Sequence, residues 1–365
     1  MAFDQIPGNV PLKDILRSAL RRKSVLPSLL FCGSEGAGQR ETARELAKAF
    51  NCERQSDDAC DECPSCRAIN AGNHPDIIDV IDLPRKMEKD ESDDKDKAEN
   101  TADDDKSGAE DSGNESDDKG KKKKNIVIDQ IRKAIELALM KPMIGRKRVF
   151  LIDDASEMKD AAANASLKIL EEPPAFTQFI LITSNPDLLL PTIRSRCQLF
   201  VFGPVGTGEI VAVLRERGLD EVRSRVVAST VRGNYQKART MDWDEFFEER
   251  GQAWELFRAI LTGKDGTEFI RRFSGGRKPA SREEMEATLD LFRGFGRDLL
   301  LLGETGEAGG LLNPDLEDGL RELASAVESG RALRLIRAVD SAMVSLDKYA
   351  NIRLMTSVLF ARMTG

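Results

Sequence analysis

Four cysteines stand close together in the sequence, and their spacing is that of a metal site. They are Cys52, Cys60, Cys63 and Cys66, with seven, two and two residues between them. Closely spaced thiolates in a chain without a secretory signal favour tetrahedral Zn²⁺, and four sulfur ligands leave no open position for catalysis. We therefore expect a structural zinc site within residues 52–66, with a pair of disulfides or free thiols as the alternative. A zinc module that reads DNA would have basic and aromatic neighbours, whereas this segment carries Glu53, Asp57, Asp58, Asp61 and Glu62.

A glycine-rich loop follows an early apolar run. Its glycines are Gly33, Gly36 and Gly38, and a helical pattern comes directly after them. A strand, such a loop and a helix N-terminus together present backbone N–H groups that can hold a phosphate. In the nucleotide-binding version the next residues are Lys, which neutralises the β- and γ-phosphates, and Ser or Thr, which holds Mg²⁺. Here these two positions are Gln39 and Arg40, which supply neither group.

The loss of both residues predicts a degenerate nucleotide site. Because phosphoryl transfer depends almost entirely on positioning and charge neutralisation, we expect no intrinsic ATPase activity and no bound ATP. A second possibility is that Arg40 restores phosphate binding without hydrolysis. Asp153 and Asp154 end the third expected strand, where an active ATPase of this kind usually has Asp-Glu. Asp153 could hold Mg²⁺, but beside such a loop we interpret both carboxylates as residues that simply end a strand.

Two arginines, Arg194 and Arg196, precede the last expected strand. Arg196 could be an ordinary surface or ion-pairing residue. It could also reach a γ-phosphate held by a neighbouring subunit, since an arginine supplied in trans raises the rate of phosphoryl transfer by roughly 10³ to 10⁵. Composition alone leaves both interpretations open.

Apolar runs typical of buried strands alternate with helical patterns over about the first 203 residues. This alternation predicts an α/β domain with a parallel sheet. The chain is then punctuated by glycine and proline at 203–206, has the pattern of a small helical unit over 209–243, and is helical in pattern from 244 onward. The expected strands are 27–32, 76–83, 148–153, 179–183 and 198–202, and the expected helices lie near 41–50, 126–140 and 161–170.

The segment 84–124 differs from the rest in composition. Its 41 residues contain 15 Asp or Glu and 11 Lys or Arg, but no Leu, Ile, Val or aromatic residue. Such a segment cannot bury enough apolar surface to offset its ordering entropy, so we expect a disordered acidic insert. Its final lysines, Lys121–Lys124, could touch a phosphate backbone, although a solvated linker end is the interpretation that we favour.

The remaining composition narrows the function classes. A net charge of −8 argues against a protein that coats nucleic acid by bulk attraction. The single histidine, His74, nearly excludes Ser-His-Asp and multi-histidine sites, and we interpret it as a loop or helix-end residue and not as a fifth metal ligand. No run approaches the roughly 18 apolar residues of a membrane span, and the N-terminus has acid and proline where a signal peptide is basic and apolar. We expect a cytoplasmic protein that does not bind membranes.

Several segments occur together in an order that is specific to one family. They are GSEGAG, the four cysteines, NHPDIIDV, IDQIR, FLIDDASEMKDAAANASLKILEEPP and ITSNPDLLLPTIRSRCQ. With them the chain resembles the clamp-loader branch of the AAA+ proteins, over residues 3–239 and more loosely in the C-terminal helices. The resemblance implies a five-stranded parallel sheet with helices on both faces, a small helical lid domain and an all-α collar domain for oligomerisation. We accordingly expect domains at 1–203, 204–243 and 244–365.

The resemblance also implies roles for single residues. In this family a Ser-Arg-Cys motif provides an arginine finger to a neighbouring ATP site, and it matches Ser195, Arg196 and Cys197. The sensor at the end of the fourth strand matches Thr183, and the arginine of the second sensor in active subunits is Gln236 here. The nucleotide site has thus lost two cationic positions while the finger is kept. This combination is similar to the δ′ type of subunit, more than to the ATP-hydrolysing γ/τ type.

The function that the resemblance implies is clamp loading in DNA replication. We expect a non-hydrolysing subunit of the bacterial DNA polymerase III holoenzyme, a DNA-directed DNA polymerase, with structural Zn²⁺ as its cofactor. The expected partners are γ/τ and δ subunits in a hetero-pentamer and, through that complex, the sliding clamp and primer-template DNA. An active AAA+ clamp-loader ATPase with an unusual loop is one alternative, and a zinc-dependent DNA-binding module is another. The insert at 84–124 departs from the family pattern, which assigns it no function.

Overall fold

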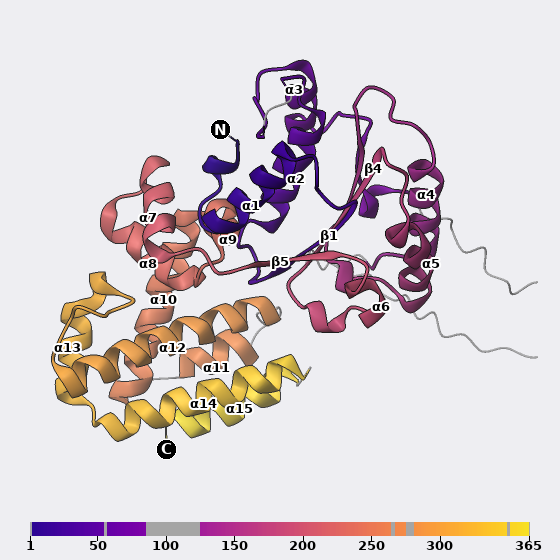
Figure 1. Ribbon diagram of the computed structural model, residues 1–365. Coiled ribbons are helices and arrows are strands. Elements are labelled where there is room, and N and C mark those ends of the chain that lie inside the picture. Colours follow the sequence, from indigo (N-terminus) through magenta and orange to yellow (C-terminus); the bar gives the residue numbers. More distant parts are fainter. Residues whose placement is uncertain are drawn as a thin grey trace, which may run out of the picture. The chain divides into compact units, whose positions relative to one another are not determined.

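Figure 1 shows the computed structural model of the chain, which describes residues 2–54, 57–84, 125–263, 267–274, 281–348 and 351–364. The acidic insert expected at 84–124 falls outside the described residues except for its first position. The chain divides into two compact units. The first consists of Met1–Ile6, Pro11–Gly33 and Gln39–Phe202, and the second of Pro7–Val10, Ser34–Gly38 and Gly203–Gly365. The separation of a lid from a collar at residue 243 stays a prediction.

The first unit is built on a five-stranded parallel sheet, as predicted. The strands lie in the order β2-β3-β4-β1-β5. The strand expected at 76–83 is shorter than predicted, because the 3₁₀ helix η2 (Val80–Asp82) begins directly after it and buries Val80. The bounds of the strands are β1 Ser28–Gly33, β2 Ile77–Asp79, β3 Arg148–Ile152, β4 Thr177–Thr183 and β5 Gln198–Phe202.

Helices cover both faces of this sheet (Figure 1). On one face α4 and α5 pack against Leu30, Phe150 and Phe179, whose alternating positions along the strands point to the same side. The opposite face is covered by α2, which buries its own apolar side. The helices of this unit are η1 Ala2–Gln5, α1 Val10–Arg21, α2 Gln39–Asn51, α3 Pro64–Asn70, α4 Ile128–Ala138, η3 Ala155–Glu157, α5 Asp160–Glu171, η4 Pro186–Leu188 and α6 Pro191–Arg194.

The regular elements described in the second unit are all helices, as the sequence predicts for this part of the chain. One apolar cluster packs α7–α9 together, and a larger one, centred on Phe257, Phe292 and Phe295, packs α10–α15. Among the described helices, none has the length and apolar character needed to cross a membrane. The helices are α7 Thr207–Glu216, α8 Glu221–Val231, α9 Tyr235–Thr240, α10 Trp243–Thr262, α11 Thr267–Ser274, α12 Arg282–Thr305, η5 Pro314–Leu316, α13 Glu317–Ala326, α14 Ser329–Asp347 and α15 Ile352–Thr364.

Candidate functional site

The glycine-rich loop joins the end of β1 to the start of α2, as predicted. Gly33 has φ +133°, and a Cβ on it would overlap the carbonyl of Phe202 in β5. Gly36 has φ +64°, and a Cβ there would overlap the side chain of Asn234, which precedes α9. Both positions require glycine because of the chain's own packing. These glycines are therefore explained without a bound phosphate.

Backbone groups of the loop are hydrogen-bonded within the protein. The N–H of Ala37 donates to the carbonyl of Ser34 at 3.3 Å, and the carbonyl of Gly36 accepts from the N–H of Gln236 at 3.2 Å. Asn234 lies against Gly36 at the same place. The start of α9 thus lies directly on the loop. Sequence reasoning selected Gln236 as a lost sensor but missed Asn234, for which no local pattern gives a signal.

Arg40 forms an ion pair with Asp153, the residue directly after β3. Its Nη1 lies 2.9 Å from Oδ2 of Asp153, with side chains 41% and 25% exposed. Burial raises the pKa of Asp153, and the positive charge of Arg40 opposes that rise. Asp154 is exposed and has φ +49°, a conformation that Asp tolerates better than most residues. One carboxylate oxygen of Asp153 is therefore paired with a cation of the chain itself.

The other residues selected around the loop have structural partners. Gln39, the first residue of α2, is buried. Thr183 is buried at the end of β4, and its hydroxyl accepts a hydrogen bond from the N–H of Asn185 at 3.1 Å. The hydroxyl of Ser195 donates to the carbonyl of Thr192 at 3.1 Å. These interactions describe where the residues lie, and their roles toward a nucleotide stay predictions.

Arg196 follows α6 and is held by two hydrogen bonds. Its Nε donates to Oε2 of Glu171 at 2.7 Å, and its Nη1 donates to the carbonyl of Thr192 at 2.9 Å. Its Nη2 has no acceptor within the described part of the chain. The nearby Arg194 forms a separate ion pair with Asp187 at 2.9 Å. The structure therefore pairs Arg196 with Glu171, a residue that the sequence did not single out.

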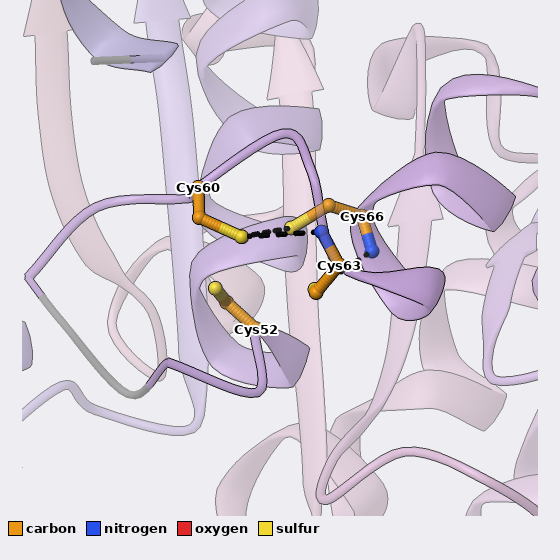
Figure 2. Close-up of side chains that lie close together, drawn as sticks. All are labelled: Cys52, Cys60, Cys63 and Cys66. Carbon is orange, nitrogen blue, oxygen red and sulfur yellow. Dashed lines mark hydrogen bonds between the residues drawn. The ribbon is translucent and has the colours of Figure 1, made fainter.

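The four predicted cysteines come together at one place (Figure 2). All four sulfur atoms lie within 4.8 Å of one another, and the Sγ atoms of Cys60 and Cys66 are 4.0 Å apart. Thiolates bound to one zinc ion at about 2.3 Å in a tetrahedron lie about 3.8 Å from each other. The donor set and its spacing thus fit one metal ion, and the cluster could hold it.

Backbone N–H groups donate hydrogen bonds to two of the sulfur atoms and so favour their thiolate form, which binds a cation. Cys63 is the N-cap of α3, where its Sγ accepts from the N–H of Cys66 at 3.4 Å, and the N–H of Cys63 in turn donates to Sγ of Cys60 at 3.4 Å. Burial raises the pKa of the Cys60 thiol, but N–H groups of Cys63 and Glu62 outweigh it and lower this pKa to about 6. Burial, together with the Cys63 sulfur, raises the pKa of Cys66. A metal ion binds the thiolate form and so favours deprotonation of the whole set.

The cysteine segment is tied to the first unit by buried polar groups. Lys48 of α2 lies 2.6 Å from Asp61, and Asp58 accepts hydrogen bonds from the N–H of Phe3 at 3.3 Å and from Arg17 at 3.1 Å. These contacts account for two of the five acidic residues of the segment, Asp58 and Asp61. Asp58 and Asp61 serve as acceptors within the chain, and the expectation that this module does not read DNA stays a prediction.

His74 lies in a loop, as expected, and sequence reasoning missed the importance of its neighbour Asp76. The Nε2 atom of His74 lies 3.2 Å from the hydroxyl of Ser65. Asp76 is fully buried and accepts hydrogen bonds from the N–H groups of Met143, Ile144 and Gly145 at 2.7–2.8 Å. Asp76 also lies 3.1 Å from the guanidinium of Arg148, the first residue of β3. Burial opposes these interactions, but together they lower the pKa of Asp76.

Comparison with known families shows to which protein family the chain belongs. A family model described as "DNA polymerase III, delta subunit" matches residues 8–206, which is more than half of the chain. The chain belongs to this family. The predicted relationship to the clamp-loader subunits of DNA polymerase III is thereby confirmed.

Three relatives illustrate the relationship. DNA polymerase III subunit δ′ of Bacillus subtilis is 28% identical over 207 residues, which cover 57% of this chain and 63% of that protein. Subunit δ′ of Escherichia coli is 44% identical over 84 residues, covering 23% of this chain and 25% of that protein. Subunit τ of B. subtilis is 27% identical over 266 residues, covering 71% of this chain and 40% of that protein. The chain thus spans less than two thirds of the length of each of these relatives.

Proposed function

We propose that the chain is a δ′-like, non-hydrolysing subunit of a bacterial DNA polymerase III clamp loader, and that Arg196 completes the ATP site of an adjacent γ/τ subunit. The observation that carries this proposal is the contrast between two arginines. Arg40 is paired with Asp153, the acid that would hold magnesium. Arg196 is held from behind and keeps Nη2 available.

The pocket lacks the groups that hydrolysis needs. Gln39 and Arg40 replace the lysine and the hydroxyl residue that would hold the phosphates and magnesium. The carbonyl of Gly36 in the loop is hydrogen-bonded to the N–H of Gln236 at the start of α9. Since phosphoryl transfer depends on positioning and charge neutralisation, a pocket without either hydrolyses no ATP.

Arg196 has the properties of a residue that acts on another subunit. Its side chain is 30% exposed, and a guanidinium presents planar donors that suit phosphate oxygens. The nucleotide pocket of its own chain already contains a paired arginine. The γ-phosphate of a partner subunit is therefore the ligand that best suits the donors on Nη2 of Arg196.

The rest of the molecule supports this subunit within a complex. We propose that the four cysteines hold a structural zinc ion and that the helices of residues 244–365 assemble with γ/τ and δ subunits into a hetero-pentamer. Through this complex the subunit helps to place the sliding clamp on primer-template DNA in the cytoplasm. The similarity to δ′ and τ subunits supports assembly with other clamp-loader subunits.

The test is ATP turnover of the reconstituted complex. The γ/τ subunit carries alanine in place of its own Ser-Arg-Cys arginine, so that turnover reports the site that Arg196 serves. Arg196→Ala should lower this turnover by about 10³-fold while the complex still assembles in gel filtration. Arg194→Ala, a change of the neighbouring ion-paired arginine, is the matched control and should leave turnover unaffected. Equal turnover in the Arg196 and Arg194 variants would remove the finger from the account.

A second candidate function is that of an active γ/τ-like ATPase. The similarity to subunit τ over 71% of this chain favours it. The isolated chain would then hydrolyse ATP, and Asp153→Ala would abolish the activity. If the isolated chain does not hydrolyse ATP, this candidate function is excluded.

A further inference from the structure

Glu171 is the last residue of α5, and it touches the proposed finger across 25 positions of sequence. Its Oε2 accepts a hydrogen bond from Nε of Arg196 at 2.7 Å. The carbonyl of Thr192 accepts a second bond, from Nη1, at 2.9 Å. The guanidinium of Arg196 is therefore held at two of its three nitrogen atoms.

Two anchors on a planar group determine more than its position. A guanidinium is rigid, and its donors point in fixed directions within one plane. Fixing Nε and Nη1 therefore also fixes the direction of the N–H groups on Nη2. Without the carboxylate at Nε, the long arginine side chain would be free to rotate about its carbon–carbon bonds, and it would have to be ordered in each catalytic cycle.

We propose that Glu171 is a positioning residue for the arginine finger: it orients Arg196 so that Nη2 faces the γ-phosphate held by the adjacent subunit. This inference rests on the proposed function. Glu171 touches neither nucleotide nor metal in this account, and it acts only through Arg196. Both partners are partly exposed, at 56% for Glu171 and 30% for Arg196, so the pair is weak enough for Arg196 to adjust when a phosphate binds.

The same corner of the fold offers a matched control. Arg194 lies two residues before Arg196 and forms an exposed ion pair with Asp187 at 2.9 Å. Both pairs join an arginine to a carboxylate, at 2.9 Å for Arg194 and 2.7 Å for Arg196, but only one of them contains the proposed finger. Loss of the Asp187 carboxylate should therefore leave catalysis unchanged.

The test uses the reconstituted complex in which the γ/τ subunits lack their own finger. Glu171→Ala should lower kcat by about fivefold, the most that an exposed ion pair contributes, with KM for ATP within about twofold of the original value. Glu171→Gln keeps an oxygen that accepts from Nε, so it should restore most of the lost kcat. Asp187→Ala should behave as the unaltered chain. A role in folding alone would predict neither the rescue by glutamine nor the selective loss of kcat.

A double variant separates this inference from the proposed function. If Glu171 acts through Arg196, then Glu171→Ala combined with Arg196→Ala should be no slower than Arg196→Ala alone. Unchanged or faster turnover in Glu171→Ala, or a Glu171→Gln variant as slow as Glu171→Ala, would overturn the positioning role while the finger itself stood. If Arg196→Ala has no effect, the proposed function fails first. Circular dichroism of each variant shows that the chain is folded.

Discussion

The glycine-rich loop and the arginine corner at residues 194–197 differ in where their polar groups are directed. At the loop, Arg40 is bound to Asp153 and the carbonyl of Gly36 is bound to the start of α9. At the corner, Arg196 is supported from behind, and Nη2 has no acceptor among the described residues. A site that binds its own charges to each other has no group left for a ligand. A site that supports one charge from behind leaves Nη2 of that charge available to a ligand.

This difference is what a division of labour between subunits would require. On our proposal the chain receives no nucleotide but completes the pocket of a neighbour. On this proposal, loss of the pocket leaves the finger intact, because Arg196 lies between α6 and β5 and not in the glycine-rich loop. Packing within the chain requires glycine at Gly33 and Gly36 whether or not the loop binds a phosphate.

The largest expected effect concerns the cluster of four cysteines. The first of them, Cys52, directly follows α2, the helix that begins with Gln39 at the glycine-rich loop. Replacing Cys60 and Cys63 by serine should reduce bound zinc from about one ion per chain to none and remove on the order of 10 kcal/mol of binding energy from the module. Elemental analysis measures the zinc content. Limited proteolysis measures how far the module is loosened when the metal is lost. Cys197→Ser, a cysteine outside the cluster, is the control and should retain the metal. A full zinc content in the double variant would contradict the assignment of the site.

The buried pair of Asp76 and Arg148 shows how much stability an ion pair can contribute in this chain, for comparison with the more exposed pairs of Arg40 and Arg196. Asp76→Asn leaves the guanidinium of Arg148 buried without its counter-charge, and should lower the free energy of unfolding at pH 7 by about 3 kcal/mol. Asp79→Asn, which removes the partner of the more exposed Arg44, should cost less than about 1 kcal/mol. Denaturation of both variants and of the unaltered chain measures the difference.

The effect of Asp76→Asn should also depend on pH. Since the folded protein lowers the pKa of Asp76, its carboxylate contributes stability above the ordinary pKa of about 3.9, and this contribution is lost as pH falls further through the lowered value. The difference between the variant and the unaltered chain should therefore be constant from pH 7 to about 5 and shrink below about 4. A difference that stays constant down to pH 3 would contradict the ionised state of Asp76.

The smallest expected effect is that of Arg40→Ala. Because this pair with Asp153 is partly exposed, its loss should change the free energy of unfolding by less than about 1 kcal/mol. The pKa of Asp153 should rise further, since Arg40 now opposes the effect of burial. ATP turnover of the complex should not change, in contrast to Arg196→Ala. Reduced turnover would mean that the loop does take part in nucleotide chemistry.

Much of the fold could be predicted from local patterns. The strands of the sheet and the helices between them follow from apolar runs and helical periodicity, and the four cysteines follow from spacing within 15 residues. These features depend on neighbouring residues in the chain, which is why the sequence alone is sufficient.

Residues that act across long separations could not be predicted in this way. Asn234 meets Gly36 only after the chain has folded, and Glu171 meets Arg196 only because α5 ends beside α6. Asp76 gathers three backbone N–H groups from a loop more than 60 residues later. An acidic residue carries no local sign of such a role. These contacts therefore depend on how elements far apart in the sequence pack together.

The measurement that tests the central claim most directly is ATP binding and hydrolysis by the purified chain, first alone and then with its γ/τ partner. The account predicts no binding and no turnover by the chain alone, and stimulated turnover in the mixture that depends on Arg196. Turnover by the chain alone that disappears in Asp153→Ala would contradict it, because Gln39 and Arg40 would then support the chemistry that we assign to the partner.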